Sequence, residues 1–392
     1  MKILWHGVPP HIPTGYGTLT KLFVPALQEL GHTVAINAVC GQLVMQKWGD
    51  VIVFPCGTRT DRVGNTYVAQ HAARFGADVV ISCIDPFGCE PTIFGKLPWY
   101  PFAIVDCEPM MIETSRALKA CRRPIAPCST VRGSLGRDGH DALYVPFGFD
   151  GADYYPAPDR AACRAELSRV TGVDMGGKFV AMMNAANMSA PSRKNFGGAL
   201  KAWGDFVRHR PDSVLYLHTE LAGIESHGMN ILRIIDQYCS ECPGTIAVVP
   251  QYEYVCGMIQ PDYLRMAYNA ADCLLCTSRG EGFGMPLIEA QACGTPVITP
   301  HFGAMAELNF SGVLVEGEMQ MGQYSGTEQM YVDLRAVVRA LRTLADATES
   351  VRADMRGNAV AAVADYEMTV VRDKYLSPAL VQIEQELADY DN

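Results

Sequence analysis

The sequence predicts an α/β fold with two halves, each built on a doubly wound parallel sheet. Short apolar runs bounded by Gly and Pro recur along the 392 residues, as buried strands do. Amphipathic stretches lie between these runs, which is typical of helices that connect parallel strands. The alternation stops near the middle of the chain and then starts again, and a chain of this length has room for two cores.

The first half begins with a strand over Ile3 to His6. The loop from Pro9 to Gly17 leads into a helix over Thr18 to Leu30, whose apolar residues recur at helical spacing and which stops at a glycine. The other apolar runs of this half predict strands at 33–38, 51–54, 79–83, 102–105 and 142–145.

A stretch between Asp150 and Gly177 contains two prolines and a glycine pair, and it predicts the region that links the halves. After it we expect strands at 179–183, 214–218, 246–249, 273–276 and 297–299, and helices at 197–209, 286–293, 329–345 and 368–387. The predicted domains are a Rossmann-like domain over 1–165, a linker over 166–177, a second Rossmann-like domain over 178–367, and a C-terminal helix over 368–392 that packs back toward the first domain. Since ligands of such sheets bind outside the carboxyl ends of the strands, we expect the site in a cleft between the halves.

Composition excludes several classes of protein. Lys and Arg minus Asp and Glu gives 32 − 42 = −10, so the net field repels polyanions and gives no general reason to expect nucleic acid or an anionic membrane as a partner. The 49% of hydrophobic residues excludes disorder for most of the chain. Cysteine, at 14 residues, is too sparse for a disulfide scaffold, and no apolar run approaches a membrane span, so we expect a soluble, cytoplasmic protein.

Two cysteine pairs, Cys239/Cys242 and Cys273/Cys276, leave zinc binding open. The second pair lies in a strand pattern, where residues three apart point to opposite faces, so one ion cannot easily take both sulfurs. Buried thiols are therefore the favoured interpretation, and we assign no metal ligands.

The most informative stretch is a glycine-rich turn between a predicted strand and a predicted helix. Three glycines lie within 280–284, and the helix can start at Pro286. Backbone N–H groups and the positive end of a helix can hold a phosphate at such a turn. Glu281 and Glu289, eight residues apart, suit the hydroxyl groups of a ligand that also carries phosphate. An ordinary glycine turn with two exposed glutamates is the alternative.

Two adjacent cations, Arg193 and Lys194, lie in the loop after the first strand of the second half. In a doubly wound half this loop opens onto the same edge of the sheet as the glycine turn. The two side chains can hold a diphosphate and stabilise it as it leaves. A solvated surface pair is the alternative.

A basic stripe is a weaker signal in the first half. Arg116, Lys119 and Arg123 share one face of a predicted helix, with Arg122 beside them. Such a stripe would suit a phosphorylated or polyanionic acceptor, including modified nucleic acid. The net charge of −10 favours a solvated helix face instead.

The segment EGFGMPLIE, from Glu281 to Glu289, resembles the E-x7-E region of the retaining, nucleotide-sugar-dependent glycosyltransferases of family 4. Ser192 to Asn195 looks like that family's donor-phosphate loop, Gly15 to Gly17 like its amino-terminal glycine loop, and 144–150 like the segment before its linker. The resemblance is strongest from about 179 to 315. It implies the GT-B fold, in which a Rossmann-like acceptor domain and a Rossmann-like donor domain face each other across a cleft.

The resemblance also implies a role for each matching residue. In the family the first Glu contacts hydroxyls of the donor sugar and the second holds the ribose, which carries over to Glu281 and Glu289. Arg and Lys bind the leaving diphosphate, which carries over to Lys194 and Arg193. The implied donor-binding set is Gly15, Gly17, Gly282, Phe283, Gly284, Met285 and Glu289. The implied reaction retains the anomeric configuration and uses no metal and no cofactor besides the nucleotide-diphosphate sugar.

Three positions depart from the family pattern. The family usually has an Arg directly after the strand where this chain has Asn184 and Ala185, so Arg193 is expected to supply that charge. Asp106 stands where the amino domain often has a His, and Phe147 replaces another His. We expect the acceptor's proton to pass to the phosphate or to Asp106, which we therefore count among the catalytic residues. Acceptor chemistry is the part of the resemblance that transfers least well.

The partners are only partly readable. We expect the nucleotide base near Gln251 to Tyr254, after the strand 246–249. The acceptor stays open among a small molecule, a glycan, a protein and modified nucleic acid. A nucleotide-sugar-binding protein or a nucleotide-sugar epimerase of the same fold, without transfer, is the alternative function.

Overall fold

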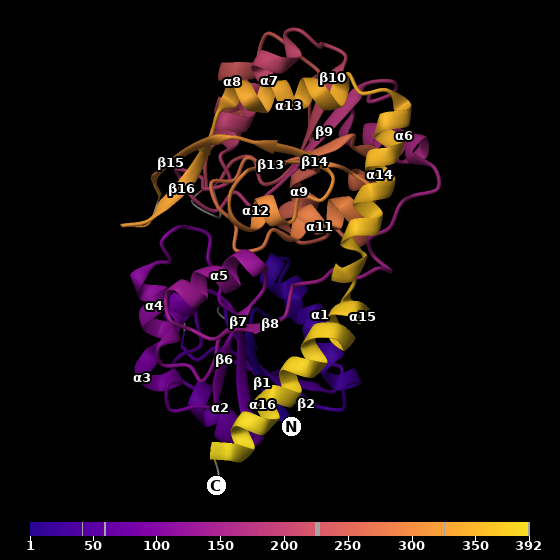
Figure 1. Cartoon of the computed structure of the whole chain (residues 1–392). Helices are drawn as coiled ribbons and strands as arrows, with labels where there is room; N and C mark the ends of the chain where they lie inside the picture. Colours follow the sequence, from indigo (N-terminus) through magenta and orange to yellow (C-terminus); the bar gives the residue numbers. More distant parts are fainter. Residues whose placement is uncertain (41, 59, 224–227, 323, 325, 391–392) are drawn as a thin grey trace. The chain divides into compact units, whose positions relative to one another are not determined.

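The computed structural model describes residues 1–40, 42–58, 60–223, 228–322, 324 and 326–390 (Figure 1). The chain divides into unit 1, Met1–Gly148 with Tyr366–Asn392, and unit 2, Phe149–Asp365. Each unit has its own parallel sheet, as the alternation of apolar runs predicts. None of the helices in the described ranges is both long and apolar enough to cross a membrane.

Unit 1 is built on a sheet with the strand order β3-β4-β2-β1-β5-β6. Its strands are β1 (Lys2–Gly7), β2 (Thr33–Ala38), β3 (Gln46–Trp48), β4 (Val51–Phe54), β5 (Val79–Cys83) and β6 (Trp99–Pro101). Neighbours are parallel except for β3, which runs antiparallel to β4. A separate short parallel pair is formed by β7 (Ile125–Ala126) and β8 (Leu143–Tyr144). The predicted bounds of β2, β4 and β5 are confirmed, because continuous apolar runs mark strands that are buried on both faces.

Helices of unit 1 come from both ends of the chain. They are α1 (Gly15–Glu29), α2 (Val68–Phe75), α3 (Pro91–Phe94), α4 (Ile112–Leu118), α5 (Ser129–Arg137), α15 (Met368–Val371) and α16 (Ser377–Tyr390), with the turns η1 (Pro86–Gly88) and η3 (Arg372–Leu376). The C-terminal helix α16, yellow in Figure 1, is held within unit 1 by Glu386. This residue accepts a hydrogen bond from Tyr100 Oη of β6 at 2.9 Å and pairs with Arg123, just before β7, at 2.9 Å.

Unit 2 has an all-parallel sheet with the order β11-β10-β9-β12-β13-β14. Its strands are β9 (Phe179–Asn184), β10 (Ser213–His218), β11 (Ile246–Val248), β12 (Cys273–Leu275), β13 (Val297–Pro300) and β14 (Gly312–Val315). The first strand in sequence, β9, lies centrally, and the chain builds outward first on one side and then on the other. This is the doubly wound order of dinucleotide-binding sheets, and its switch point lies between β9 and β12.

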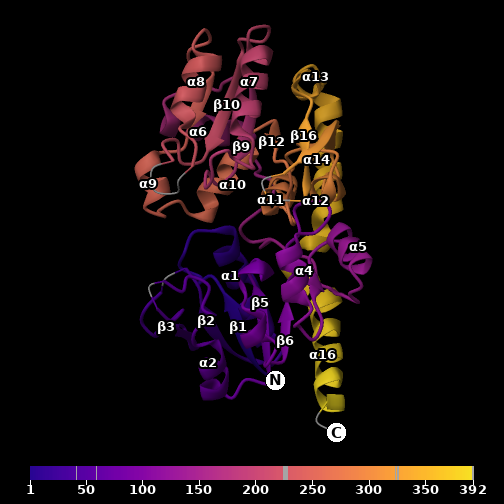
Figure 2. The same cartoon turned by 90° about the vertical axis from the view of Figure 1, so that its left-hand side faces the viewer.

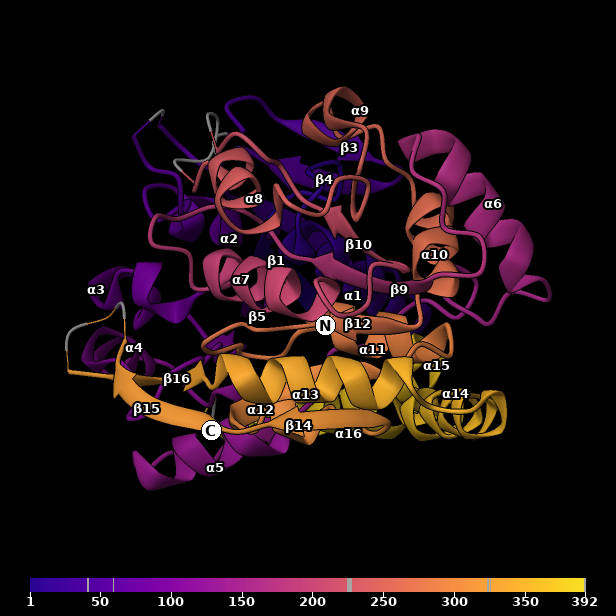
Figure 3. The same ribbon diagram turned by 90° about the horizontal axis from the view of Figure 1, so that it is seen from above.

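Helices cover the sheet of unit 2. They are α6 (Arg160–Thr171), α7 (Phe196–Val207), α8 (Ile231–Cys239), α9 (Gln251–Val255), α10 (Pro261–Ala270), α11 (Met285–Ala292), α12 (Gly303–Glu307), α13 (Leu334–Ala345) and α14 (Glu349–Val363), with the turn η2 (Ala364–Tyr366) at the boundary. Alternate residues of β9, namely Phe179, Ala181 and Met183, pack in one core with α7, α8 and α13. Figures 2 and 3 show α8 and α13 each lying beside α7.

The predicted helix over 329–345 is wrong in its first part. Glu328–Val332 form β16, which pairs antiparallel with β15 (Gly317–Met321). The hairpin is tightly packed, since a Cβ at Gly317 would lie 2.2 Å from the Tyr331 carbonyl oxygen. The helix begins only at Leu334, because the Asp333 side chain caps it by accepting from Arg335 N at 2.9 Å.

The predicted domain boundary and linker also differ from the structure. We expected the first domain to end at residue 165 and the linker to span 166–177. Helix α6 (Arg160–Thr171) crosses this predicted boundary, and the whole helix belongs to unit 2. Arg164 of α6 holds it there by donating to Asp272 at 2.5 Å and to the Ala270 carbonyl at 2.8 Å. The prolines before α6 and the glycines after it flank a helix, and the units divide instead at Gly148 and again at Asp365.

Three smaller expectations in unit 1 are corrected. Strand β6 ends at Pro101, before the predicted 102–105, and Phe102 makes only an isolated bridge to Ile125. Helix α1 starts at Gly15, because the Thr14 side chain caps it by accepting from Gly17 N at 3.1 Å. The basic stripe does not form, because α4 ends at Leu118 and the chain then leaves the helix. Arg123 instead pairs with Asp141 and Glu386.

Candidate functional site

The loops that follow β9 and β12 form the candidate site of unit 2. These two strands are parallel neighbours, so both loops leave the same edge of the sheet. One loop carries Arg193 and Lys194, and the other carries the glycine turn 280–284. The structure therefore brings together the two segments that the sequence singled out, at the switch point where doubly wound sheets bind their ligands.

Backbone hydrogen bonds join the two loops. Arg279 N donates to the Arg193 carbonyl at 2.9 Å, and Thr277 Oγ1 lies 3.3 Å from the Lys194 carbonyl. Asn195 has a left-handed backbone, with φ of 57°, and its side chain caps α7 by accepting from Gly198 N at 3.2 Å. The two cations are thus held on a rigid turn beside the glycine turn.

Both cations contact Glu281. Lys194 Nζ donates to Glu281 Oε1, and Arg193 Nη1 donates to the Gly280 carbonyl and lies 3.1 Å from Glu281 Oε2. The side chains are 21%, 22% and 11% exposed for Lys194, Arg193 and Glu281. Burial disfavours the charged carboxylate, but the Lys194 and Arg193 charges outweigh it and lower the pKa of Glu281 to about 2. Within the described residues, Lys194 and Arg193 thus bring two positive charges to the one negative charge of Glu281.

The glycine turn ends in a backbone shape that only glycine adopts easily. Gly284 has φ of 103°, and a Cβ there would lie 3.0 Å from Leu287 Cδ1. Helix α11 starts at the next residue, with Pro286 in its first turn, close to the predicted start. The N-terminal amides and the helix dipole therefore add to the positive field at this edge of the sheet.

Glu289 lies farther along α11 and is 5% exposed. Burial raises the pKa of Glu289 to about 7, with a smaller contribution from Asp153, while the hydrogen bond from Tyr268 acts in the opposite direction. Tyr268 Oη donates to Glu289 Oε2 at 2.9 Å, and Asn184 Nδ2 donates to Tyr268 Oη at 2.8 Å. The sequence reasoning missed Tyr268, because it is 21 residues from Glu289 and carries no motif of its own.

In the segment Gln251 to Tyr254, where we expected the nucleotide base, the Gln251 side chain binds backbone groups of neighbouring loops. Gln251 Nε2 donates to the carbonyls of Thr219 and Val249, each at 3.0 Å. Gln251 Oε1 accepts from Leu221 N at 2.9 Å. Both amide hydrogens of Gln251 are therefore used, one in the loop after β10 and the other at Val249 after β11, whereas Tyr252 is 70% exposed.

In unit 1, Gly15 and Gly17 follow β1, which is one of the two strands at the switch point between β1 and β5. Gly15 and Gly17 lie in the first turn of α1, not in a loop before it. A Cβ at Gly17 would lie 2.1 Å from the Ile12 carbonyl oxygen, while nothing lies within 4 Å of one at Gly15. Asp106 is half-buried in the loop after β6, one strand away from the switch point.

A second acidic residue of unit 1 was not singled out from the sequence. Asp85 follows β5, directly at the switch point, and its Oδ1 accepts a hydrogen bond from Tyr16 Oη at 2.9 Å. Its signal in the sequence is its place two residues after a buried strand, the position from which loop residues of such sheets reach ligands.

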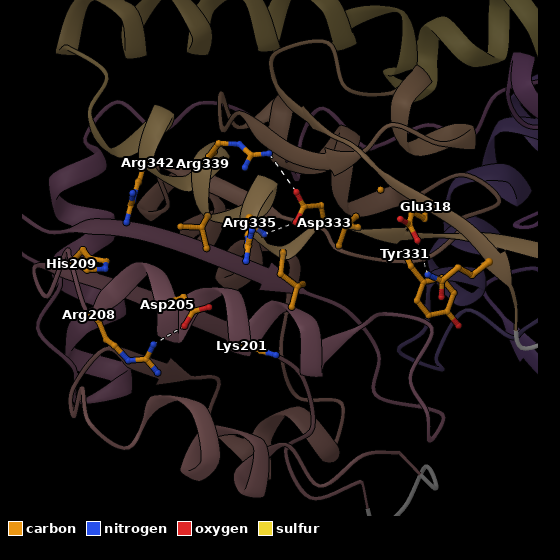
Figure 4. Close-up of a pocket in the computed structure, with 15 residues that line it drawn as sticks. Lys201, Asp205, Arg208, His209, Glu318, Tyr331, Asp333, Arg335, Arg339 and Arg342 are labelled. Atoms are coloured by element: carbon orange, nitrogen blue, oxygen red, sulfur yellow. Dashed lines mark hydrogen bonds and ion pairs between the residues drawn. The ribbon is translucent and has the colours of Figure 1, made fainter.

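A groove of about 890 Å³ lies elsewhere on unit 2, between α7, α13 and the β15–β16 hairpin (Figure 4). Its charged residues, all exposed, are Lys201, Asp205, Arg208, Glu318, Asp333, Arg335, Arg339 and Arg342. Acids of the groove offset part of this charge, since Arg208 pairs with Asp205 at 2.6 Å and Arg339 with Asp333 at 3.5 Å. Exposed, hydrated cations hold an anion weakly, so the partly buried cluster around Glu281 is the stronger candidate.

The cysteines form no disulfides. All 14 lie in the described ranges as free thiols, including both pairs considered for zinc. Cys273 is buried, and Cys276 Sγ lies 4.0 Å from Met305 Sδ. Within the part of the chain that the structure describes, no group of three or more His, Cys, Asp or Glu side chains is arranged to hold a metal ion.

Comparisons with known proteins cover the part of the chain that holds this candidate site. Residues 182–325 match the family model described as Glycosyl transferases group 1, and this range contains both loops and α11. The D-inositol 3-phosphate glycosyltransferase of Kineococcus radiotolerans is 28% identical over 253 residues, 60% of this chain and 52% of that protein. The protein of the same name from Segniliparus rotundus is 30% identical over 44% of this chain and 35% of its own length. The chain thus spans about half or less of these relatives.

Solved structures share the fold over the whole chain. Sucrose-phosphate synthase from Thermosynechococcus elongatus superposes with a TM-score of 0.72 at 17% identity, covering 100% of both chains. Anabaena HepE in complex with UDP and glucose has a TM-score of 0.70 at 16% identity, covering 97% of this chain and 100% of its own. The chain therefore has the GT-B fold of two Rossmann-like units, and the match to the Glycosyl transferases group 1 model covers residues 182–325 of it.

Proposed function

We propose that the protein is a glycosyltransferase that moves a sugar from a nucleotide-diphosphate sugar to an acceptor hydroxyl, with retention of the anomeric configuration and without a metal ion. The observation that carries the proposal is the cluster of Lys194, Arg193 and Glu281 beside the N-terminus of α11. Positive charge and backbone amides converge there at the switch point of a dinucleotide-type sheet. HepE, which shares the fold, was crystallised with UDP and glucose.

The cluster has a direct chemical use in this reaction. When the bond between the sugar and the diphosphate breaks, negative charge grows on the leaving diphosphate. Lys194, Arg193 and the amides of 282–285 stabilise that charge more strongly in the transition state than in the bound donor. Because these groups already supply positive charge, the proposal needs no metal ion. Breaking this bond also leaves positive charge on the sugar. The acceptor hydroxyl attacks the sugar from the same face that the diphosphate leaves, so the anomeric configuration is retained.

Glu281 changes partners in this scheme. In the structure it neutralises one of the two positive charges of the cluster. A diphosphate entering the site takes over Lys194 and Arg193, and Glu281 is then available to accept hydrogen bonds from hydroxyls of the donor sugar. Glu289 binds the ribose hydroxyls, and Gly15, Gly17 and Gly282 to Met285 complete the donor site.

Unit 1 supplies the acceptor side in this proposal. The acceptor's proton passes to the departing diphosphate or to Asp106. All 14 cysteines are free thiols, which is typical of a reducing compartment, so we place the reaction in the cytoplasm.

The test is release of nucleoside diphosphate from a panel of nucleotide sugars, beginning with UDP-glucose and with D-inositol 3-phosphate as the first acceptor. We expect release that rises with an acceptor, Glu289→Ala to weaken nucleotide binding, and Lys194→Ala to slow turnover more than it weakens binding. Release that ignores every acceptor would favour donor hydrolysis, and an altered sugar still attached to its nucleotide would favour the epimerase alternative. Unchanged kinetics in both variants would overturn the assignment of this site.

A further inference from the structure

A buried chain of hydrogen bonds connects the end of β9 to Glu289. It runs from the Asn184 amide through the Tyr268 hydroxyl to Glu289 Oε2, with distances of 2.8 Å and 2.9 Å. Tyr268 is fully buried, and Glu289 is 5% exposed. Three elements far apart in the sequence, β9, α10 and α11, each contribute one member.

The chain has a fixed direction. The Asn184 side-chain amide is the donor to Tyr268, so it occupies an acceptor position of the hydroxyl oxygen. The single hydroxyl hydrogen of Tyr268 is then directed to Glu289. Glu289 Oε1, by contrast, has no hydrogen-bond partner in the ranges that the structure describes. One carboxylate oxygen is therefore held and the other is left for a ligand.

We propose that Tyr268 and Asn184 are positioning residues for Glu289, and that they present its second oxygen to the ribose hydroxyls of the donor. The inference rests on the proposed function, because it concerns the carboxylate assigned to the nucleotide. It adds two residues that neither the motif nor the family match singles out. It also gives Asn184, a departure from the family pattern, a task of its own.

The uncharged amide of Asn184 suits this task. An arginine in its place would bring a positive charge toward a buried carboxyl group, which would favour the ionised form and compete with Tyr268 as a donor. Asn184 orients the tyrosine without adding charge. The missing positive charge for the diphosphate is then supplied by Arg193, whose guanidinium lies at Gly280 and Glu281.

The other ionisable groups around Glu289 set the direction of its response to pH. Asp153 acts to raise the pKa of Glu289. Tyr154, which packs edge-on against Tyr268 at 6.1 Å, and Cys293, at the end of α11, both stay neutral, because burial and the Glu289 charge raise their pKa values. Arg265 of α10 acts on Tyr154 and Cys293 in the opposite direction. Burial raises the pKa of Glu289 to about 7 despite the Tyr268 hydrogen bond, so the loss of that bond would raise it further.

The ionised carboxylate accepts hydrogen bonds from two hydroxyls, so donor binding should weaken as Glu289 takes up a proton. We expect Tyr268→Phe to weaken nucleoside diphosphate binding about threefold to tenfold at high pH, the worth of one hydrogen bond. We also expect the midpoint of the pH dependence to move up by about half a unit to one unit. A merely structural role would lower the affinity by the same factor at every pH.

The experiment is calorimetric titration with UDP, ADP, GDP, CDP and TDP, followed by a pH series with the tightest of them. Tyr263→Phe is the matched control, because it removes a hydroxyl from the same helix that bonds to Tyr216 at 3.2 Å, and it should leave the midpoint unchanged. Asn184→Ala should shift the midpoint in the same direction as Tyr268→Phe, by less. In a Glu289→Gln background, Tyr268→Phe should cause no shift, because the titrating group is gone.

The outcomes distinguish a failure of the proposed function from a failure of the positioning role. Absence of binding by all five nucleotides would overturn the proposed function, and this inference with it. Binding by the wild type with the same midpoint in Tyr268→Phe would overturn the positioning role alone. A shift that persists in the Glu289→Gln background would also overturn it, because the effect would then belong to another group.

Discussion

The glycine turn and the helix that follows it each carry a carboxylate, and the two carboxylates behave in opposite ways. Glu281 in the turn contacts two cations, and its pKa falls to about 2 because their charges outweigh the effect of burial. Glu289 in α11 is buried with a tyrosine as its partner, and burial raises its pKa to about 7. The residues are of the same type, eight positions apart in one motif.

The difference shows that the surroundings of each carboxylate determine its role. Glu281 stays ionised at ordinary pH, and in the proposed mechanism it partly neutralises the cations that bind the diphosphate. Glu289 can gain or lose a proton near neutral pH, and we propose that it thereby makes donor binding depend on pH. Pairs of carboxylates whose pKa values are pushed apart by their environments commonly divide the work of a site in this way.

The largest expected effect is that of Lys194→Ala on turnover. Removal of a group that stabilises the leaving diphosphate should lower kcat by about 100-fold to 1,000-fold, with a smaller change in donor KM. Release of nucleoside diphosphate at saturating donor measures it. Lys201→Ala, an exposed lysine of the groove on α7, is the control and should leave kcat unchanged. Equal effects of the two variants would contradict a special role for the cluster.

The stability of the two glutamine variants should depend on pH in opposite ways. The folded pKa of Glu289 lies above its ordinary value of 4.5, so the folded state binds more protons and stability falls as the pH rises from about 4.5 to 7. Glu289→Gln should therefore be more stable than the wild type at pH 8, by up to about 3 kcal/mol from 1.36 kcal/mol per pKa unit. The two should converge near the lower end of that window.

The stability of Glu281→Gln, relative to the wild type, should depend on pH in the opposite way. Its folded pKa lies below 4.5, so its stabilising effect is complete above about that pH and is lost as the pH falls toward 2. Glu281→Gln should thus be less stable than the wild type at neutral pH, by up to about 3 kcal/mol, and should approach it in acid. Urea unfolding at several pH values measures both variants. The same sign of change for both at pH 8 would break the comparison.

A smaller effect is expected on the binding of inorganic diphosphate. Glu281→Gln removes the negative charge that competes for Lys194 and Arg193, so diphosphate should bind about tenfold more tightly, while sugar transfer is lost. Glu318→Gln removes an exposed charge of the groove and serves as the control. If diphosphate bound more weakly to Glu281→Gln, exchange of partners within the cluster would be ruled out.

The smallest expected effect concerns the backbone of the turn. Gly284→Ala should cost about 1 kcal/mol of stability, because alanine resists φ of 103° and its Cβ would lie 3.0 Å from Leu287. Gly15→Ala should change stability little, since nothing surrounds a Cβ at that position and the residue lies in a helix. Thermal unfolding of the two variants compares them directly. A neutral Gly284→Ala would show that the turn does not need its glycine.

The sequence predicts the strands of the two parallel sheets better than the segments around them. Strands β2, β4 and β5 are apolar apart from Thr33, Asn37 and Ser82, and their bounds follow directly from the pattern. The pattern does not separate β16 (Glu328–Val332) from the amphipathic helix α13 that follows it, because only Asp333 lies between the two elements. The sequence predicts a linker over part of α6, because prolines precede this helix and glycines follow it.

Part of the site could also be predicted, for a related reason. Glu281 and Glu289 share a local motif, and the cation pair is placed beside them by the rule that parallel strands end at a common edge. Tyr268 and Asn184 lack any such signal, since they are 84 residues apart and meet only when α10 packs near β9. Contacts of this kind depend on tertiary packing, which a single sequence does not display.

The most direct test of the account is a crystal structure of the wild-type protein with UDP-glucose or, failing that, with the nucleoside diphosphate that binds most tightly. We expect the diphosphate at hydrogen-bonding distance, about 2.7 to 3.2 Å, from Lys194 Nζ and from amides of 282–285, with Glu281 no longer bound to Lys194. A nucleotide bound elsewhere, with the Lys194–Glu281 pair intact, would contradict it.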